Sequence, residues 1–149
     1  MIALGCDHGG FSLMVEIKKY LEETGREYRD FGTFSAESCD YPTYAEAACR
    51  AVVSGECEKA ILVCGTGIGM SMAANKIRGI RAAVCSDCFS TEMTRRHNDA
   101  NAMCLGERVM GPGLALKLVE IFLTTEFDGG RHARRVAMVN ALEGDPREK

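Results

Sequence analysis

The chain has 149 residues, of which 46% are hydrophobic and 26% charged, and its formal net charge is −3. These values are typical of one globular domain with a single core, and they exclude a disordered or fibrous protein. The slight acidity argues against a nucleic-acid or anionic-membrane surface, because neutralising phosphates needs a dense basic stripe. The N-terminal run Met1 to Asp7 has no cationic segment and is too short for a signal peptide or a membrane span, so we expect a cytoplasmic protein.

Short β-type runs alternate with helical patterns, which predicts an α/β domain with a parallel sheet covered on both faces. In the first helix, over 11–23, Leu13, Ile17 and Leu21 recur at helical spacing. Pro42 suits the first position of a second helix that reaches about residue 53. The strands are expected at 2–6, 28–31, 60–64, 81–85 and 102–105, and further helices begin after residue 64 and span about 90–97 and 112–123.

The C-terminal region predicts a last helix over about 132–143, after Gly129-Gly130 and a basic segment. No strand follows this helix, although Val136, Val139 and Leu142 give it an apolar stripe. Such a stripe must be buried, and a partner subunit is one place for it. We therefore expect a single domain over 1–149 whose last helix packs on a partner, with a frayed tail over 144–149.

Eight cysteines could indicate a disulfide framework, but most of them lie inside apolar runs. Reduced, buried thiols are the better interpretation. The Cys85-x-x-Cys88 pair lacks a second pair at zinc-ligand spacing and thioredoxin-like surroundings, so a metal or redox role is disfavoured. A strand end beside a helix start explains this pair.

Glycine and polar residues follow the expected strands at their carboxyl ends, where open parallel sheets bind ligands. Asp7-His8-Gly9-Gly10 follows the first strand, and the glycine-rich stretch 65–71 follows the third. Backbone N–H groups of such a stretch can approach an anion. A dinucleotide site competes with this interpretation, because Asp87 lies twenty residues beyond Gly67. Met70 stands in place of the third glycine, however, and the domain has no second half for a dinucleotide.

Cys64 ends a strand directly before this glycine-rich stretch, where a thiol can serve as a base. A buried strand-end thiol is the common interpretation of such a cysteine, but nearby anion-stabilising N–H groups suit proton abstraction beside a carbonyl. Acyl transfer would use the same thiol and the same N–H groups. Arg131 and Arg135 would share a helix face and could grip a phosphate, although a solvated basic face explains them equally well. The residues alone thus predict an anion site with a candidate thiolate base.

Six motifs make the chain resemble the type B ribose-5-phosphate isomerases: GCDHGG at 5–10, DYP at 40–42, CGTGIG at 64–69, ANK at 74–76, HND at 97–99 and GRH at 130–132. Together they cover nearly the whole chain. The resemblance implies a three-layer α/β/α, Rossmann-like domain with a five-stranded parallel sheet in the order 2-1-3-5-4. It also implies a sugar-phosphate substrate, no metal or cofactor, and a homodimer whose sites draw residues from both subunits; a tetramer stays open as the larger assembly.

The resemblance also implies a role for each site residue. Cys64 would shuttle a proton between C2 and C1 of the opened aldose through a cis-enediolate. His97 would assist ring opening by proton transfer at the ring oxygen, and Asp7 and Thr66 would help to place hydroxyls. The substrate-binding residues would be Gly65, Gly67, Gly69 and Ser71 at the enediolate or open chain, Tyr41 and Asn98 at the sugar, and His8, Arg108, Arg131 and Arg135 at the phosphate.

Several alternatives stay open within and beyond this family. Some members use a glutamate base in this loop, but Met70 offers no carboxylate here. Galactose-6-phosphate isomerases divide their catalytic residues between two different polypeptides, whereas Cys64 and His97 occur together in this chain. We expect ribose 5-phosphate and ribulose 5-phosphate as substrates, with a hexose or a hexose 6-phosphate of the allose 6-phosphate type as the alternative. A noncatalytic sugar-phosphate binding module is disfavoured, because such a module would tolerate the loss of Cys64 and His97 and this chain has both.

Overall fold

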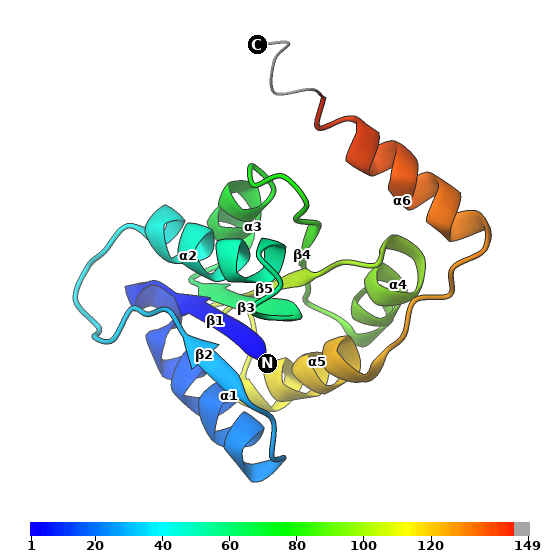
Figure 1. The fold of residues 1–149 in the computed structure, drawn as a ribbon. Helices are drawn as coiled ribbons and strands as arrows, with labels where there is room; N and C mark the ends of the chain where they lie inside the picture. Colours follow the sequence, from blue (N-terminus) through cyan, green and yellow to red (C-terminus); the bar gives the residue numbers. More distant parts are fainter. Residues whose placement is uncertain (145–149) are drawn as a thin grey trace.

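Five parallel strands form the centre of the molecule, in a computed structural model that describes residues 1–144 (Figure 1). They are β1 (Ile2–Cys6), β2 (Tyr28–Asp30), β3 (Lys59–Cys64), β4 (Ala82–Val84) and β5 (Ala102–Gly106). Their order, β2-β1-β3-β5-β4, confirms the expected topology. The inner strands β1 and β5 are buried along their whole length, which explains why they are continuous apolar runs.

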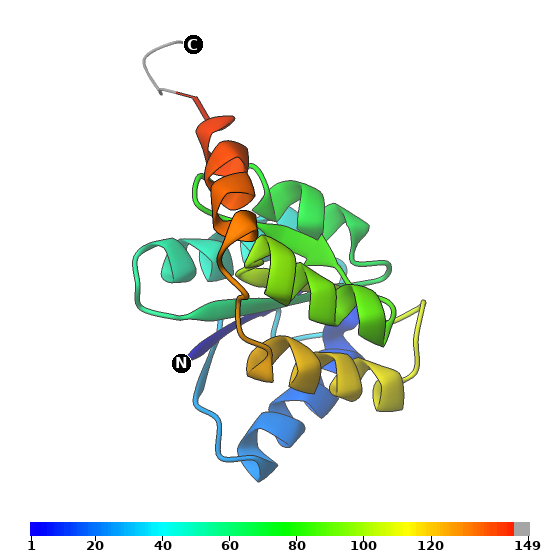
Figure 2. The same cartoon turned by 90° about the vertical axis from the view of Figure 1, so that its right-hand side faces the viewer.

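Helices cover both faces of the sheet and give the expected three layers (Figures 1 and 2). On one face lie α1 (Phe11–Glu23) and α5 (Pro112–Thr124), with α4 (Cys88–Asn98) beside α5. On the other face lie α2 (Tyr41–Val53) and α3 (Ile68–Ala74). A short 3-10 turn, η1 (His8–Gly10), joins β1 to α1.

Small residues let α2 lie close to the sheet. Ala45 and Ala48 are fully buried, and a Cβ at Gly5 of β1 would stand 2.9 Å from the carbonyl oxygen of Tyr44. A larger side chain at any of these positions would push the helix off the strand. The alanine-rich composition of this segment therefore fixes the spacing between helix and sheet.

Three expected elements differ from the structure by one or two residues at their ends. β4 covers 82–84 rather than 81–85, because Arg81 turns its guanidinium toward the carbonyls of Asn98 and Asp99 at the end of α4. α4 begins at Cys88 rather than at 90, because the Asp87 carboxylate caps it and accepts the Ser90 N–H at 2.7 Å. The last helix, α6 (Arg131–Ala141), replaces the expected 132–143; the left-handed backbone of Gly129 and Gly130 sets its start.

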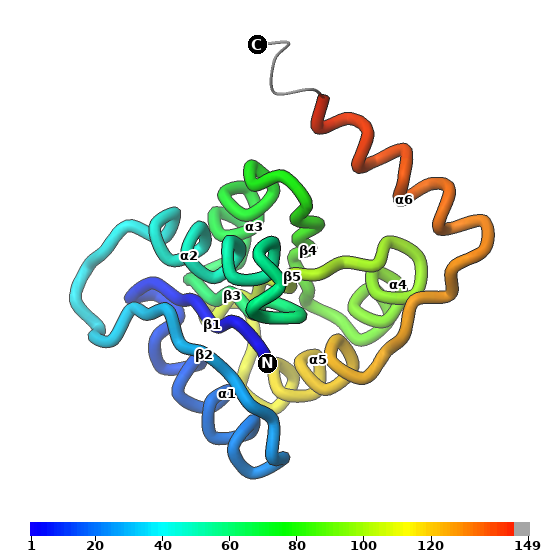
Figure 3. Tube along the Cα trace, in the orientation of Figure 1, coloured from blue at the N-terminus to red at the C-terminus, as the bar shows by residue number. Residues whose placement is uncertain are grey.

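α6 extends away from the body of the domain, as the chain trace makes clear (Figure 3). Its first turn packs on α4, and His132 is its single buried residue within 131–141. Met138 and Val139 are more than half exposed, and Leu142 just after the helix is 86% exposed. Of the tail expected to fray, only Gly144 falls within the described residues. Among residues 1–144, no helix combines the length and apolar character needed to cross a membrane.

Candidate active site

Cys64 lies at the carboxyl end of β3, where the residue is 5% exposed and its thiol accepts the Gly67 N–H at 3.1 Å. Gly67 has a φ of +79°, and a Cβ on it would stand 3.1 Å from the carbonyl carbons of Cys104 and Leu105. Only glycine fits this left-handed, crowded turn without strain. The turn thereby aims a backbone donor at the sulfur.

The two turns that follow β1 and β3 touch each other. A Cβ on Gly9 would lie 3.2 Å from the Gly65 nitrogen, and one on Gly10 would lie 2.6 Å from the Val63 carbonyl. Asp7 is 7% exposed and accepts the Gly9 N–H at 2.9 Å, which caps η1. The expected gathering of both turns at one edge of the sheet is therefore present.

His8 is fixed in one tautomer by the loop before α2. Its Nδ1 accepts the Cys39 N–H at 3.2 Å, and the Cys39 Sγ lies 3.9 Å from the same nitrogen. Because Nδ1 accepts, the proton of a neutral ring sits on Nε2. His8 therefore offers an N–H donor to a ligand even when uncharged. The contact also gives a structural role to Cys39, for which sequence reasoning found none.

Tyr41 and Arg108 border the glycine-rich stretch on two sides. A Cβ on Gly69 would stand 2.8 Å from Cζ of Tyr41, and one on Gly65 would stand 3.4 Å from Nη1 of Arg108. The Arg108 N–H donates to the Gly65 carbonyl at 3.0 Å, so the turn after β5 is tied to the turn after β3. An aromatic hydroxyl and a guanidinium thus flank the thiol's loop.

Glu107, which sequence reasoning missed, ties the turn after β5 to the start of α1. Its carboxylate accepts the Leu13 N–H at 2.9 Å and so satisfies a free donor at the start of α1. Its position just after a buried strand was the one signal that could have drawn attention to it.

The hydroxyls of Thr66 and Ser71 are used locally. Thr66 Oγ1 accepts the Ile68 N–H at 3.3 Å, while Ser71 donates its hydroxyl to the Ile68 carbonyl at 2.8 Å. The Ser71 N–H also serves the helix, through the Gly67 carbonyl at 3.1 Å. Within residues 1–144, by contrast, the N–H groups of Gly69 and Met70 donate to no protein atom. These two backbone donors are available to an anion.

The remaining four candidates lie at the amino edge of the sheet, opposite Cys64: they are His97, Asn98, Arg131 and Arg135. α4 starts at the carboxyl end of β4 and ends before the amino end of β5, so its last turn carries His97 and Asn98 to the amino edge. Arg131 and Arg135 are exposed on α6, which packs on α4. A groove of about 860 Å³ is lined there by Asn98 and Arg135 among others, and not by Cys64. One chain therefore holds its candidate residues in two separate groups.

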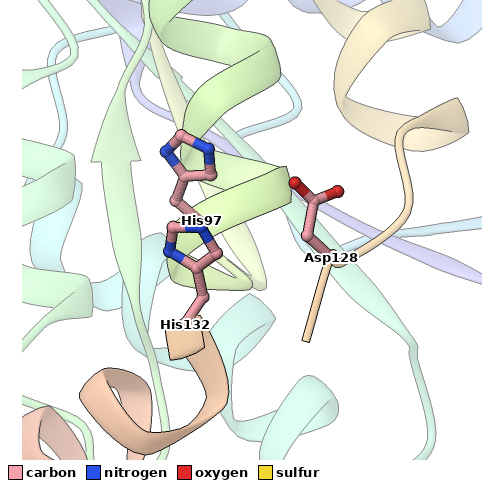
Figure 4. Close-up of side chains that lie close together, drawn as sticks. All are labelled: His97, Asp128 and His132. Atoms are coloured by element: carbon pink, nitrogen blue, oxygen red, sulfur yellow. The ribbon is translucent and has the colours of Figure 1, made fainter. Parts of the chain in front are cut away.

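His97, Asp128 and His132 form a cluster in the second group (Figure 4). One ligand atom from each lies within 4.8 Å of the others, a spacing at which three side chains could hold a metal ion. The two imidazoles are stacked, however, with centroids 4.2 Å apart and planes inclined by 6°. A metal–imidazole bond lies in the plane of the ring, so two parallel rings cannot direct their lone pairs at one ion. The cluster as oriented does not suit a metal.

Three buried cysteines away from the loop, Cys6, Cys49 and Cys85, are protonated thiols. Burial raises the pKa of Cys6 and Cys49 to about 12 and that of Cys85 to about 11, the nearby Asp30 adding to the effect at Cys6. All eight cysteines are free, and Cys88 is exposed at the start of α4. The Cys85-x-x-Cys88 spacing thus joins a buried strand end to a helix start.

Comparison with known proteins agrees with this geometry. A family model described as Ribose/Galactose Isomerase matches residues 2–139. The chain is 49% identical to ribose-5-phosphate isomerase B of Escherichia coli, over 95% of each chain. It is 50% identical to a putative sugar phosphate isomerase of Bacillus subtilis, over 95% of this chain and 96% of the relative.

Solved structures show the same likeness. A ribose-5-phosphate isomerase B of Clostridium thermocellum is 51% identical, with a TM-score of 0.94 over 95% of this chain and 96% of that one. A type B ribose 5-phosphate isomerase of Trypanosoma brucei is 46% identical, with a TM-score of 0.92 over 95% and 97% of the two chains. With the family model covering almost its full length, the chain belongs to the ribose/galactose isomerase family.

Proposed function

We propose that this protein interconverts ribose 5-phosphate and ribulose 5-phosphate through a cis-enediolate, with Cys64 as the base. The thiolate takes the proton from C2 of the open aldose, and the carbonyl electrons move onto O1 as the C1–C2 double bond forms. The same proton, or one exchanged with water, returns to C1, while the O2 hydroxyl gives its proton to O1 and becomes the ketone. The observation that carries this proposal is the placement of Cys64 Sγ against the Gly67 N–H at 3.1 Å.

Backbone donors beside the thiol support the enediolate step. The free N–H groups of Gly69 and Met70 are the preorganised kind of donor that stabilises charge developing on an oxygen. Thr66 and Asp7 stand at the same edge and would place hydroxyls, with Tyr41 against the sugar. Gly65, Gly67 and Ser71 would hold the open chain through the shape of the loop.

A second copy of the chain would complete each site in a homodimer. His97 and Cys64 lie at opposite edges of one sheet, so proton transfer at the ring oxygen and at C2 of one substrate requires two chains. The second copy would bring Asn98 to the sugar, and Arg131 and Arg135 to the phosphate. In the first chain, Arg108 and the Nε2–H of His8 would complete the phosphate site. The exposed apolar residues at the end of α6 would then be covered by the partner. A tetramer built from two such dimers is the larger alternative, and we infer that the enzyme acts in the cytoplasm.

The substrate range has one alternative to test. A relative named D-erythrulose-4-phosphate isomerase, from Pectobacterium atrosepticum, is 38% identical over 95% of this chain, so the family shape accepts more than one chain length. Allose 6-phosphate remains the six-carbon alternative, because the length of the pocket depends on the loop over 32–41, whose Cys39 N–H donates to His8.

Interconversion assays with purified protein test the proposal. Ribose 5-phosphate, ribulose 5-phosphate and allose 6-phosphate are each supplied with a metal chelator present, and the aldose and ketose are separated and quantified. We expect rapid turnover of the five-carbon pair with a higher kcat/KM than allose 6-phosphate. A preference for the six-carbon sugar would reassign the substrate, and inactivity on all three would remove the isomerase proposal.

A further inference from the structure

The stacked pair of His97 and His132 joins α6 to the domain. His132 is the buried residue of α6, and its ring lies flat on that of His97, with centroids 4.2 Å apart and planes inclined by 6° (Figure 4). The stack places the His132 ring against one face of the imidazole that the proposed function assigns to ring opening. A ring confined in this way has few orientations left.

The segment before α6 is fixed to α4 next to this stack. Arg96 donates from Nε to both carboxylate oxygens of Asp128, at 3.1 and 3.2 Å, and its carbonyl accepts the Asp128 N–H at 3.0 Å. Asp128 also lies within 4.8 Å of both imidazoles. The chain therefore returns to α4 one residue before His97, and this return sets the approach of His132.

The surroundings of His132 favour the neutral form of its ring. Burial lowers its pKa, and the neighbouring His97 of α4 and Arg131 and Arg135 of α6 lower it further, while Asp128 acts in the opposite direction. A neutral ring can pack face to face on its neighbour, whereas two charged rings at this distance would repel each other. His132 is thus suited to support its neighbour through packing.

We propose, on the basis of the proposed function, that His132 is a positioning residue that fixes the plane of the His97 imidazole for opening the sugar ring. In that step the C1–O4 bond of the furanose breaks, the O1 hydroxyl gives its proton to solvent water and forms the carbonyl, and O4 gains a proton from His97, which water then restores. Only a correctly oriented N–H reaches O4, and misplacement of a catalytic group by about 1 Å can cost on the order of a hundredfold in rate. The helix that carries Arg131 and Arg135 for phosphate binding thereby also serves ring opening, through His132.

The experiment compares a reaction that needs ring opening with one that does not. Ribose 5-phosphate closes into a furanose, but ribulose 5-phosphate stays open because its O5 carries the phosphate. Exchange of its C1 hydrogen with deuterium from solvent, followed by NMR, therefore requires Cys64 and the enediolate but no ring opening. Both reactions are measured at saturating substrate, so that weaker phosphate binding does not enter the comparison.

His132→Ala should lower conversion of ribose 5-phosphate by on the order of ten- to a hundredfold, while open-chain exchange falls by less than about threefold. His97→Ala should show the same pattern, and His132→Phe, which keeps a flat ring, should recover most of the conversion. Arg134→Ala, an exposed change on the same helix, should leave both reactions unchanged. Equal losses of the two reactions in His132→Ala, or no loss, would overturn the inference. Absence of both reactions in the unchanged protein would instead refute the proposed function, and the inference would fall with it.

Discussion

Mixing two inactive variants tests whether each active site is built from two chains. Cys64→Ala removes the proposed base at the carboxyl edge of the sheet, and His97→Ala removes the proposed acid at the amino edge. Each variant alone should lose most of its turnover of ribose 5-phosphate, because every site of its homodimer lacks one group. A mixed dimer has one site with both changes and one site with neither.

The expected recovery follows from counting sites. Random pairing of equal amounts yields about half mixed dimers, and half of their sites are intact, so activity should return to about a quarter of the unchanged protein's. The two variants are co-refolded or co-expressed, and initial rates are compared with those of each variant treated alone. If activity stays at the level of the separate variants, His97 and Cys64 do not act across two chains, and the two-chain site is wrong.

Three further predictions concern single residues. Gly67→Ala should destabilise the protein by roughly 2–4 kcal/mol, because its Cβ adds backbone crowding to left-handed strain, while Gly55→Ala, with a similar φ of +80° and open space, should cost only roughly 1–2 kcal/mol in denaturant unfolding. Equal losses would contradict the crowding argument. Arg135→Ala should raise KM for ribose 5-phosphate about tenfold or more and change kcat little, since the phosphate is remote from the reacting carbons; a defect confined to kcat would contradict its role. In native protein at pH 8, iodoacetamide should label exposed Cys88 far faster than Cys49, whose burial raises its thiol pKa to about 12, as peptide mass spectrometry would detect; comparable labelling would refute that burial.

The sheet and its carboxyl edge could be predicted because local patterns decide them. Apolar runs in β1 and β3 end in glycine and polar residues, and parallel strands bring such ends together. The sequence alone therefore suffices to place Cys64, Asp7 and His8 at the same edge of the sheet. The same logic located the glycine-rich stretch, whose left-handed Gly67 tolerates no other residue without strain.

The second group could not be predicted from local patterns. The stack of His97 on His132 depends on how the segment over 125–130 returns to α4, which only tertiary packing determines. Likewise, the tautomer of His8 depends on a backbone N–H of Cys39, thirty-one residues away. Sequence reasoning gave His132 no role beyond the GRH motif at 130–132 and left Cys39 unassigned, because neither contact has a periodicity or spacing that would reveal it.

The most direct test of the account is the turnover of ribose 5-phosphate by Cys64→Ser, measured beside Cys88→Ser as a matched control in an exposed position. Serine is nearly isosteric with cysteine, so the variant should fold and still bind the substrate, which protection against thermal unfolding by ribose 5-phosphate would report. Its hydroxyl is far less acidic than a thiol, so we predict that kcat falls by at least about a thousandfold while Cys88→Ser stays fully active. Turnover by Cys64→Ser at the rate of the unchanged protein would contradict the assignment of Cys64 as the base.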